Sequence, residues 1–306
     1  MTTVSLVIPS YQRPDALANC LASVRAQTRP FDEVIVVVRS GDSQTRDVAT
    51  GLNVRTVSVE EPGVLAAMIA GTAASTGEVV AFTDDDATLT PSWCEQVAAT
   101  MSDPVNAQLG GLGGRDHIFD GELSRETTLT KDVGRVSFWG RLIGNHHRGL
   151  GRVDGVHVLK GVNSAYRRSA LGLPRGLRGD GAQAHYEVAV GAFVHRAGFQ
   201  LRYDANLIVY HRPAVRSDED QRATPSAEAV ANSAFNLMRA LGAAQQSRRW
   251  LYVHLVGDRS CPGLIRCFIA IVNADRATLA RRAPTWRATS EAWRIRKSPL
   301  DFETFS

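Results

Sequence analysis

Short apolar segments alternate with helix-like segments over the first hundred residues, and this alternation limits the possible folds more than any other feature. Four apolar runs are typical of buried strands: residues 4–8, 34–38, 54–59 and 79–82. Between them, residues 13–27 place Leu17, Leu21 and Val24 at helical spacing, and residues 64–75 are rich in Ala and Leu. Strands that alternate with helices predict an α/β fold, with a mostly parallel sheet covered by helices on both faces.

The middle and C-terminal parts of the chain follow other patterns. Residues 110–160 are rich in glycine and polar side chains, which predicts loops and short antiparallel strands, with strand character at residues 156–159. Later elements are expected as a helix over 187–197, a strand over 207–210 and helices from Ser226 onward. We predict a sheet domain over residues 1–217, divided near residue 101, and a helical extension over residues 218–306.

Charge is distributed unevenly along the chain. Residues 239–306 carry twelve Lys/Arg and five Asp/Glu, or +7, so the first 238 residues carry −3 of the total of +4. Two apolar runs in this basic part, residues 250–253 and 264–272, are far shorter than the roughly 18 residues of a spanning helix. No nucleic-acid reading module is recognisable. The pattern predicts peripheral contact with an anionic membrane surface, with simple packing of these helices as the alternative.

Three aspartates directly follow the apolar run at residues 79–82. Ligands of parallel sheets bind beyond the carboxyl ends of the strands, and adjacent carboxylates repel one another unless a cation compensates them. Asp84 and Asp86, two positions apart in a turn, can point toward one position, and carboxylate oxygens favour Mg²⁺ or Mn²⁺. We predict a divalent metal site here; the alternative is a solvated acidic turn before the next helix.

Several stretches together resemble the family 2 glycosyltransferases of the GT-A fold. They are VSLVIPSYQRPDALANCLASV from residue 4, DEVIVVVRSGDSQT from residue 32 and EEPGVLAAMIAGTAASTGEVVAFTDDD from residue 60. GLGGRD at 111–116, KGVNSAYRR at 160–168 and the stretch 185–211 also resemble a bacterial subgroup that acts in surface polysaccharide or glycolipid assembly. The resemblance implies inverting transfer of a sugar from a nucleotide-diphosphate donor to a hydroxyl of a glycan or lipid-linked saccharide. Residues 1–101 would then bind the donor and residues 102–217 the acceptor.

The resemblance also implies donor contacts. The expected donor-binding residues are Pro9, Tyr11, Arg13, Asp42, Asp84, Asp85 and Arg212. Arg212 and Arg216 could bind the diphosphate, with a role as plain surface charges as the alternative. Asp42 falls where the family reads the nucleotide base, although a plain turn-forming role is the alternative. The sequence departs from the family at Val38-Arg39, which replace an acidic pair, and at Met68-Ile69, which replace Arg-Asn.

Catalysis and metal binding are implied at positions further along the chain. The family places two acids eleven to twelve residues before a glycine; counting back from Gly198 gives Tyr186 and Glu187, so Glu187 is the expected general base. Its alternative role is to favour a helix N-terminus electrostatically, and Asp180 is the second candidate base. His211 is implied as a third metal ligand, or else as a hydrogen-bonded structural residue.

The acceptor side and the remaining alternatives complete the prediction. The resemblance implies Lys160, Asn163 and Arg167 on the acceptor side, whereas His146-His147 are expected to be ordinary loop residues.

A sugar nucleotidyltransferase is disfavoured because no glycine-rich loop follows the first strand, and a dinucleotide oxidoreductase is disfavoured for the same reason. A non-catalytic glycan-binding or scaffold member stays open because Tyr186 replaces an acid. The four cysteines lack C-x-x-C spacing, which predicts free thiols in a reducing compartment. The chain starts without an apolar leader, so we expect a cytoplasmic protein, with peripheral attachment to the inner face of the plasma membrane as one option.

Overall fold

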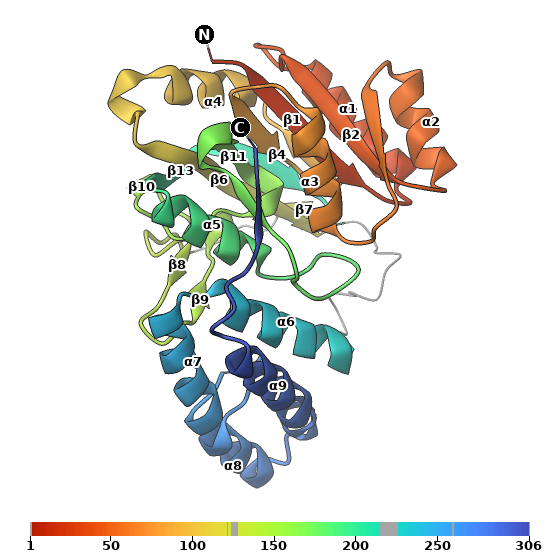
Figure 1. Cartoon of the computed structure of the whole chain (residues 1–306). Helices are drawn as coiled ribbons and strands as arrows, with labels where there is room; N and C mark the ends of the chain where they lie inside the picture. The colour runs from red at the N-terminus through yellow and green to blue at the C-terminus, as the bar shows by residue number, and fades with distance from the viewer. Residues whose placement is uncertain (1, 121, 124–127, 214–225, 259, 306) are drawn as a thin grey trace.

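The computed structural model describes residues 2–120, 122–123, 128–213, 226–258 and 260–305. A large sheet with helices on both faces forms one end of the molecule, and a bundle of helices projects from it (Figure 1). This architecture is an α/β fold with a helical C-terminal region, as predicted.

The first four strands are parallel and lie side by side in the order β4-β1-β2-β3. Their bounds are Val4–Ser10 for β1, Glu33–Arg39 for β2, Arg55–Val59 for β3 and Val79–Phe82 for β4. Two of the connecting helices, α1 (Pro14–Arg25) and α3 (Val64–Ala74), were expected. A third, α2 (Ser43–Gly51), was not, because its sequence is polar and reads as a turn.

The other half of the sheet is built mostly from segments that the sequence pattern did not reveal, although the strand expected over 207–210 is confirmed as the end of β13. Strands β6 (Leu109–Asp120), β11 (Ser164–Arg167), β13 (Gln200–His211) and β10 (Arg152–Asp154) extend the sheet beyond β4, and β5 (Ala87–Leu89) pairs with β13. The glycine-rich run that predicted loops is therefore the start of a long strand. A Cβ atom on Gly114 would overlap the carbonyl oxygen of Leu207, so close strand packing requires glycine there.

One expectation about the middle of the chain was wrong. Residues 156–159 form no strand and continue irregularly after β10. Helix α4 (Trp93–Ser102) begins shortly after Thr90, whose hydroxyl donates to the carbonyl of Ile208 at 3.1 Å. The helix predicted from residue 187 is confirmed as α5 (Tyr186–Arg196).

Apolar side chains fill both faces of the sheet. One core lies under α1 and α4 around Trp93, and a second lies under α3 and α5 around Phe82 and Tyr166. Short elements complete this part of the chain: β7 (Glu122–Leu123), β8 (Arg135–Val136), β9 (Leu142–Ile143) and β12 (Gly172–Pro174).

The C-terminal part is helical but returns to the sheet domain. Its helices are α6 (Ala227–Ala240), α7 (Ala243–Leu255), α8 (Leu264–Val272) and α9 (Arg276–Arg294); α6 packs on α5 and α9. The last strand, β14 (Phe302–Thr304), pairs with β12, so the extension is not helical to its end. The predicted boundary after residue 217 lies in a segment outside the described residues. Among the described helices, none has the length and apolar character to cross a membrane.

Candidate active site

A cavity of about 520 Å³ lies at the carboxyl edge of the parallel strands. The ends of β1, β2 and β3 contribute Pro9, Arg39 and Val59 to its wall, and the turn after β4 contributes Asp84 and Asp85. Its other wall comes from residues 158–162 and from the segment that leads into α5. This is the position that the strand arrangement predicted for a ligand.

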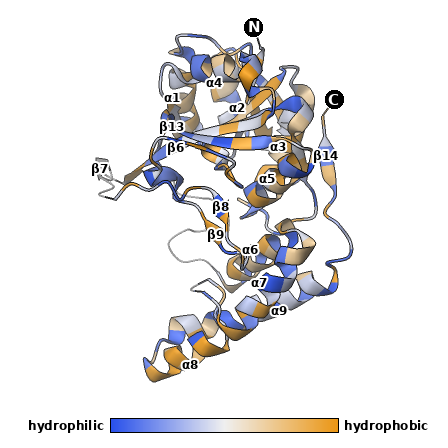
Figure 2. Cartoon of the chain, turned by 90° about the vertical axis from the view of Figure 1, so that its left-hand side faces the viewer, coloured by the Kyte–Doolittle hydropathy of each residue, from blue (hydrophilic) through white to orange (hydrophobic). Residues whose placement is uncertain are grey.

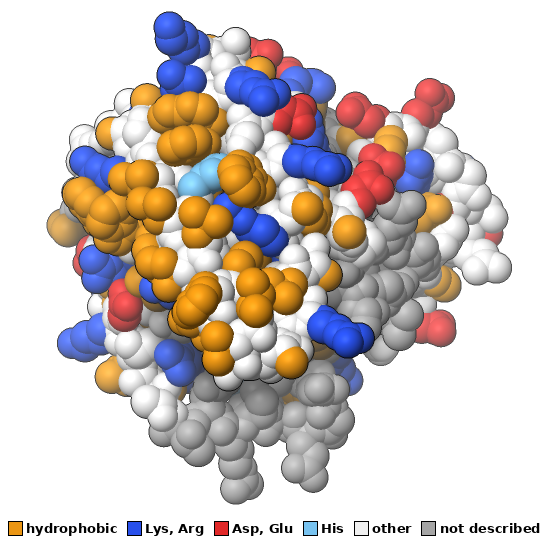
Figure 3. Space-filling model, turned by 90° about the horizontal axis from the view of Figure 1, so that it is seen from below, with side chains coloured by type: hydrophobic (Ala, Val, Ile, Leu, Met, Phe, Trp, Pro, Cys, Tyr) orange, Lys and Arg blue, Asp and Glu red, His pale blue; other side chains and the backbone are white. Residues whose placement is uncertain are grey.

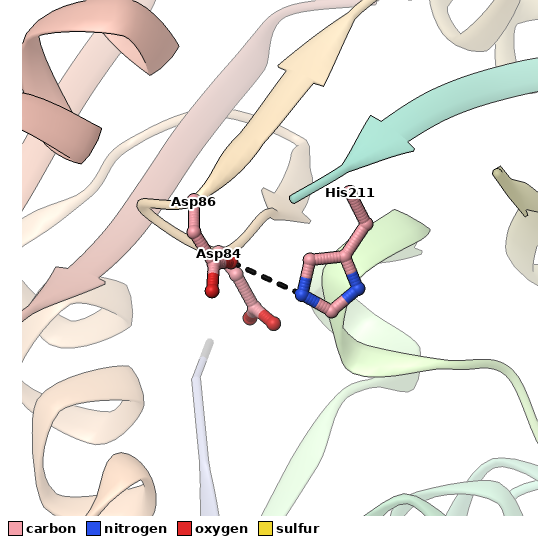
Figure 4. Close-up of side chains that lie close together, drawn as sticks. All are labelled: Asp84, Asp86 and His211. Atoms are coloured by element: carbon pink, nitrogen blue, oxygen red, sulfur yellow. Dashed lines mark ion pairs between the residues drawn. The ribbon is translucent and has the colours of Figure 1, made fainter. Parts of the chain in front are cut away.

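Two aspartates and one histidine come together at the edge of this cavity. Oxygen atoms of Asp84 and Asp86 and a ring nitrogen of His211 all lie within 4.8 Å of one another (Figure 4). His211 reaches this place because β13 pairs with β5, which sets His211 opposite Ala87. Within the described part of the chain, neither ring nitrogen of the fully buried His211 has a hydrogen-bond partner, and Nε2 faces Asp86 Oδ1 at 3.1 Å. Two carboxylates and one imidazole form a donor set that suits a divalent cation.

Asp85, the middle aspartate, has a different environment. Its buried carboxylate accepts hydrogen bonds from Arg13 Nη1 at 2.8 Å and from the Ser10 hydroxyl at 2.7 Å. Burial raises the pKa of Asp85 to about 6, although Arg13 and Ser10 both act to lower it. Asp85 thus fixes Arg13 against the aspartate turn.

The cavity wall beside the ends of β1 and β2 contains two residues that were not predicted as site residues. Arg39 and Glu61 line the cavity with Pro9 and Tyr11, and the Arg39 guanidinium lies over the Tyr11 ring at 5.3 Å. Arg39 is the last residue of β2, so its place at the carboxyl end of a parallel strand could have predicted it as a site residue. The departure from the family at this residue therefore falls on the cavity wall.

Asp42 is placed by backbone contacts. Its carboxylate accepts from the backbone N–H groups of Gln12 at 2.6 Å and Thr45 at 3.2 Å, and it caps α2. These contacts match the alternative, turn-forming role. A contact of Asp42 with the donor base stays a prediction.

Glu187 lines the cavity in the first turn of α5. Burial raises the pKa of its carboxyl, while the nearby Lys160 ammonium acts in the opposite direction. Tyr186 lies beside it, and an added Cβ on Gly161 would overlap the Tyr186 hydroxyl. Asp180 also lines the cavity, as an exposed residue of the loop before α5.

The three residues implied on the acceptor side do not lie together. Lys160 lines the cavity and pairs with Asp116, whose side chain is fully buried. The buried Asn163 amide accepts from Trp93 Nε1 and donates to two backbone carbonyls. Strand β11 runs antiparallel to β4, which sets Arg167 beside Val79 at the opposite end of the strand from Asp84. An acceptor-side role for these two residues stays a prediction.

The Arg212 side chain packs on Phe119 and is not among the residues that line the cavity. Its guanidinium lies 4.9 Å from the centre of the Phe119 ring, while its backbone N–H donates to the carbonyl of Asp86 at 2.9 Å. Arg216 lies outside the described residues. His146, expected to be an ordinary loop residue, is buried, lines the cavity and contacts the carbonyl of Val158 at 3.0 Å.

A mostly parallel sheet covered by helices, with an acidic turn and a cavity at its carboxyl edge, is the arrangement of the GT-A fold. Residues 5–172 match the family described as Glycosyl transferase family 2, and the chain belongs to this family.

Curated relatives are similar over part of their length. An N-acetylglucosaminyltransferase from Rhizobium meliloti (strain 1021) is 29% identical over 233 residues, which cover 68% of this chain and 51% of that protein. A putative glycosyltransferase, EpsH, from Bacillus subtilis (strain 168) is 30% identical over 108 residues, or 34% of this chain and 31% of that protein. The chain therefore spans about half or less of the length of these relatives.

Solved structures show the same fold. The mannosyltransferase PcManGT from Pyrobaculum calidifontis, solved with GDP-Man and Mn²⁺, has a TM-score of 0.57 at 15% identity and covers 97% of this chain and 87% of its own. Residues 1–349 of S. aureus TarS, solved with UDP-GlcNAc, give a TM-score of 0.55 at 14% identity, with coverages of 95% and 91%. At such identities the likeness concerns the fold alone.

Proposed function

We propose that this protein is an inverting glycosyltransferase that moves a sugar from a nucleotide-diphosphate donor to a hydroxyl of a glycan or lipid-linked saccharide. The position of Asp84 carries the proposal. Asp84 belongs to the metal-type group with Asp86 and His211, and it also lines the cavity that contains Glu187. A donor diphosphate site and a candidate general base thus face the same space.

The donor half of the cavity is suited to a nucleotide diphosphate. Its volume lies within the range of small-molecule sites, about 300–1,000 Å³. Pro9, Tyr11 and Arg39 offer a flat wall for a base, and Arg13 is held at the aspartates by Asp85. Asp84, Asp86 and His211 would hold Mg²⁺ or Mn²⁺, and such an ion would neutralise the charge of the leaving diphosphate. The GDP-Man, Mn²⁺ and UDP-GlcNAc found in structures of the same fold support this assignment.

Glu187 is the proposed general base. Its carboxylate would take the proton of the acceptor hydroxyl as that oxygen attacks the anomeric carbon and the diphosphate leaves. A carboxyl whose pKa is raised by burial is a stronger base than an exposed one, and the nearby Lys160 ammonium acts to lower that pKa. Asp180 is the second candidate, at the cavity mouth.

A neighbouring polar cavity supports acceptor entry near Asp180. It also measures about 520 Å³ and shares Glu61, Asp180 and Gly181 with the first cavity. Ser226, Glu228 and Asn232, from the start of α6, form its outer wall. Polar side chains of this kind bind sugar hydroxyls. We extend the proposal to the predicted contact of the basic C-terminal helices with an anionic membrane surface, where a lipid-linked acceptor would reside.

Turnover of a nucleotide-sugar panel tests the proposal. The protein is incubated with donors, Mn²⁺ and simple glycan or lipid-linked acceptors, and released nucleotide diphosphate is measured with and without EDTA. Metal-dependent release, with the opposite anomeric configuration in the product, is the expected result. Donor binding without release would favour the non-catalytic scaffold, and formation of pyrophosphate would favour a nucleotidyltransferase.

A further inference from the structure

Helix α8 exposes an unusually apolar surface at the end of the molecule farthest from the sheet domain (Figure 2). Six of its nine residues are exposed large hydrophobic side chains, including Phe268 at 68% and Val272 at 71% relative exposure. The full set is Leu264, Ile265, Phe268, Ile269, Ile271 and Val272. At 100° per residue these six fall within an arc of about 160°. Ala270, on the opposite side, is buried where α8 packs against α7 and α9.

The neighbouring elements continue this surface, which we call the apolar tip. Leu251, Leu255 and Val256 at the end of α7 and Trp286 of α9 are also exposed. Eleven of the sixteen exposed large hydrophobic side chains in the described part of the chain lie between residues 251 and 295. Such a concentration marks an interaction surface rather than the scattered exposure common on soluble domains.

Positive charge surrounds the apolar tip. Residues 260–297 carry eight Lys/Arg and two acids. Both acids are engaged locally, since Asp275 caps α9 through Thr278 and Glu291 pairs with Arg178. Figure 3, which looks onto this end, shows hydrophobic side chains interspersed with Lys and Arg. The partner must therefore offer apolar groups beneath a negatively charged surface.

We propose that α8 is a membrane-insertion helix: it lies in the plane of an anionic bilayer, with its six apolar side chains in the boundary between head groups and acyl chains. This inference deepens the proposed function and rests on its membrane contact. The helix is about 13–14 Å long, which suits shallow insertion and is less than half the length needed to span. Arg266 and Arg276 then reach lipid phosphates, and Trp286, with the Arg282 guanidinium 4.0 Å from its ring, lies at the level of the head groups.

Charge argues against a second copy of the chain on this surface. A symmetric contact through α8 would place the same basic residues of two copies opposite each other. Like charges across an interface disfavour association. An anionic bilayer satisfies the apolar and the charge requirement together.

Vesicle binding by the full chain tests the proposal with two matched variants. The tip variant is F268S/I271S, and the control is V105S/L150S, which removes two exposed apolar side chains from the sheet domain. Co-sedimentation uses vesicles of phosphatidylcholine alone and of equal amounts of phosphatidylcholine and phosphatidylglycerol, across a salt series. We expect the tip variant to lose about tenfold or more of its partition onto the anionic vesicles, while the control binds like the unaltered chain. Binding of the unaltered chain should weaken with salt without vanishing.

The remaining outcomes separate this proposal from its alternatives. Absence of binding by the unaltered chain, or equal binding by the tip variant, overturns it. A lipid-free dimer that F268S/I271S dissociates, together with absent vesicle binding, would assign the tip to a second copy. Binding of UDP or GDP with Mn²⁺ is measured on all three proteins: equal affinities show that the tip variant is folded. A failure of nucleotide binding in the unaltered chain would count against the proposed donor site and leave the vesicle result standing.

Discussion

The Nε2 atom of His211 lies 3.1 Å from Oδ1 of Asp86, and Asp84 completes the group (Figure 4). The pairing of β13 with β5 creates this contact between residues far apart in the sequence. A ring nitrogen and two carboxylates whose atoms lie within 4.8 Å of one another are close enough to bind one cation together. The arrangement makes metal dependence the first property to measure.

Binding of a nucleotide diphosphate is predicted to need both a metal ion and Asp86. The physical reason is that Asp86 would supply one of the two carboxylates of the metal-binding group. Calorimetry with UDP or GDP should show binding with Mn²⁺ and none in EDTA, and Asp86→Ala should behave like the EDTA sample. Asp47→Ala, on the exposed face of α2, is the matched control. Undiminished binding in EDTA, or by a folded Asp86→Ala protein, would remove the metal assignment.

His211→Gln is predicted to lower the affinity for Mn²⁺ and to leave the protein folded. Loss of one ligand should raise the Mn²⁺ concentration needed for nucleotide binding about tenfold or more, with a smaller effect on Mg²⁺, because imidazole suits Mn²⁺ better. Metal titrations followed by thermal shift give the midpoint, and His147→Gln is the control. An unchanged Mn²⁺ midpoint in a folded variant would make His211 a structural residue.

Glu187→Gln is predicted to keep donor binding and to lose transfer by about 10²-fold or more, the usual contribution of a general base. In the unaltered enzyme, kcat/KM should fall on acidification through a pKa above the ordinary glutamate value, because burial raises the pKa of this carboxyl. Steady-state kinetics across pH check both statements, with the exposed Glu60→Gln as control. Near-normal turnover of Glu187→Gln would move the base elsewhere, and Asp180→Asn would be measured next.

Gly161→Ala is predicted to reduce transfer by displacing Tyr186 and, with it, the start of α5. The added methyl group would overlap the Tyr186 hydroxyl and lie 3.1 Å from Cζ of the same ring. Tyr186→Phe removes the overlapping oxygen, so the double variant should recover part of the lost activity. A double-mutant cycle on kcat measures this coupling. Additive effects of the two substitutions would show that the contact does not position Glu187.

The fold is predicted to lose stability in mild acid through His185. Burial lowers the pKa of His185 from 6.5 to about 4 in the folded protein, whereas the unfolded chain takes up this proton near its ordinary value. Stability is therefore complete above about pH 6.5 and is lost as pH falls toward 4; between pH 7 and 5 the loss is about 2 kcal/mol. His185→Asn, which tolerates the left-handed backbone at this position, should flatten that slope in denaturant titrations. An unchanged slope would show that His185 does not titrate in this range.

The sequence by itself determined the first half of the sheet domain. Apolar runs that end in polar turns specify parallel strands locally, so β1 to β4, helices α1 and α3 and the aspartate turn were predicted close to their observed places. The position of Glu187 in the first turn of α5 also followed from its spacing to Gly198. These features depend on neighbours along the chain, which the sequence shows directly.

Only the tertiary structure decided the rest, because it depends on contacts between distant segments. The run at residues 110–114 is a strand because it pairs with β11 and β13, and Leu207 and other neighbours leave no room for side chains there. Lys160 and Arg167 are seven residues apart and lie toward opposite ends of β11. Lys160 therefore lines the cavity, whereas Arg167 donates to backbone carbonyls away from it. The pairing of β14 with β12 likewise joins segments that are far apart in the sequence. The apolar side chains of α8 are exposed because no other element of the described chain packs over them.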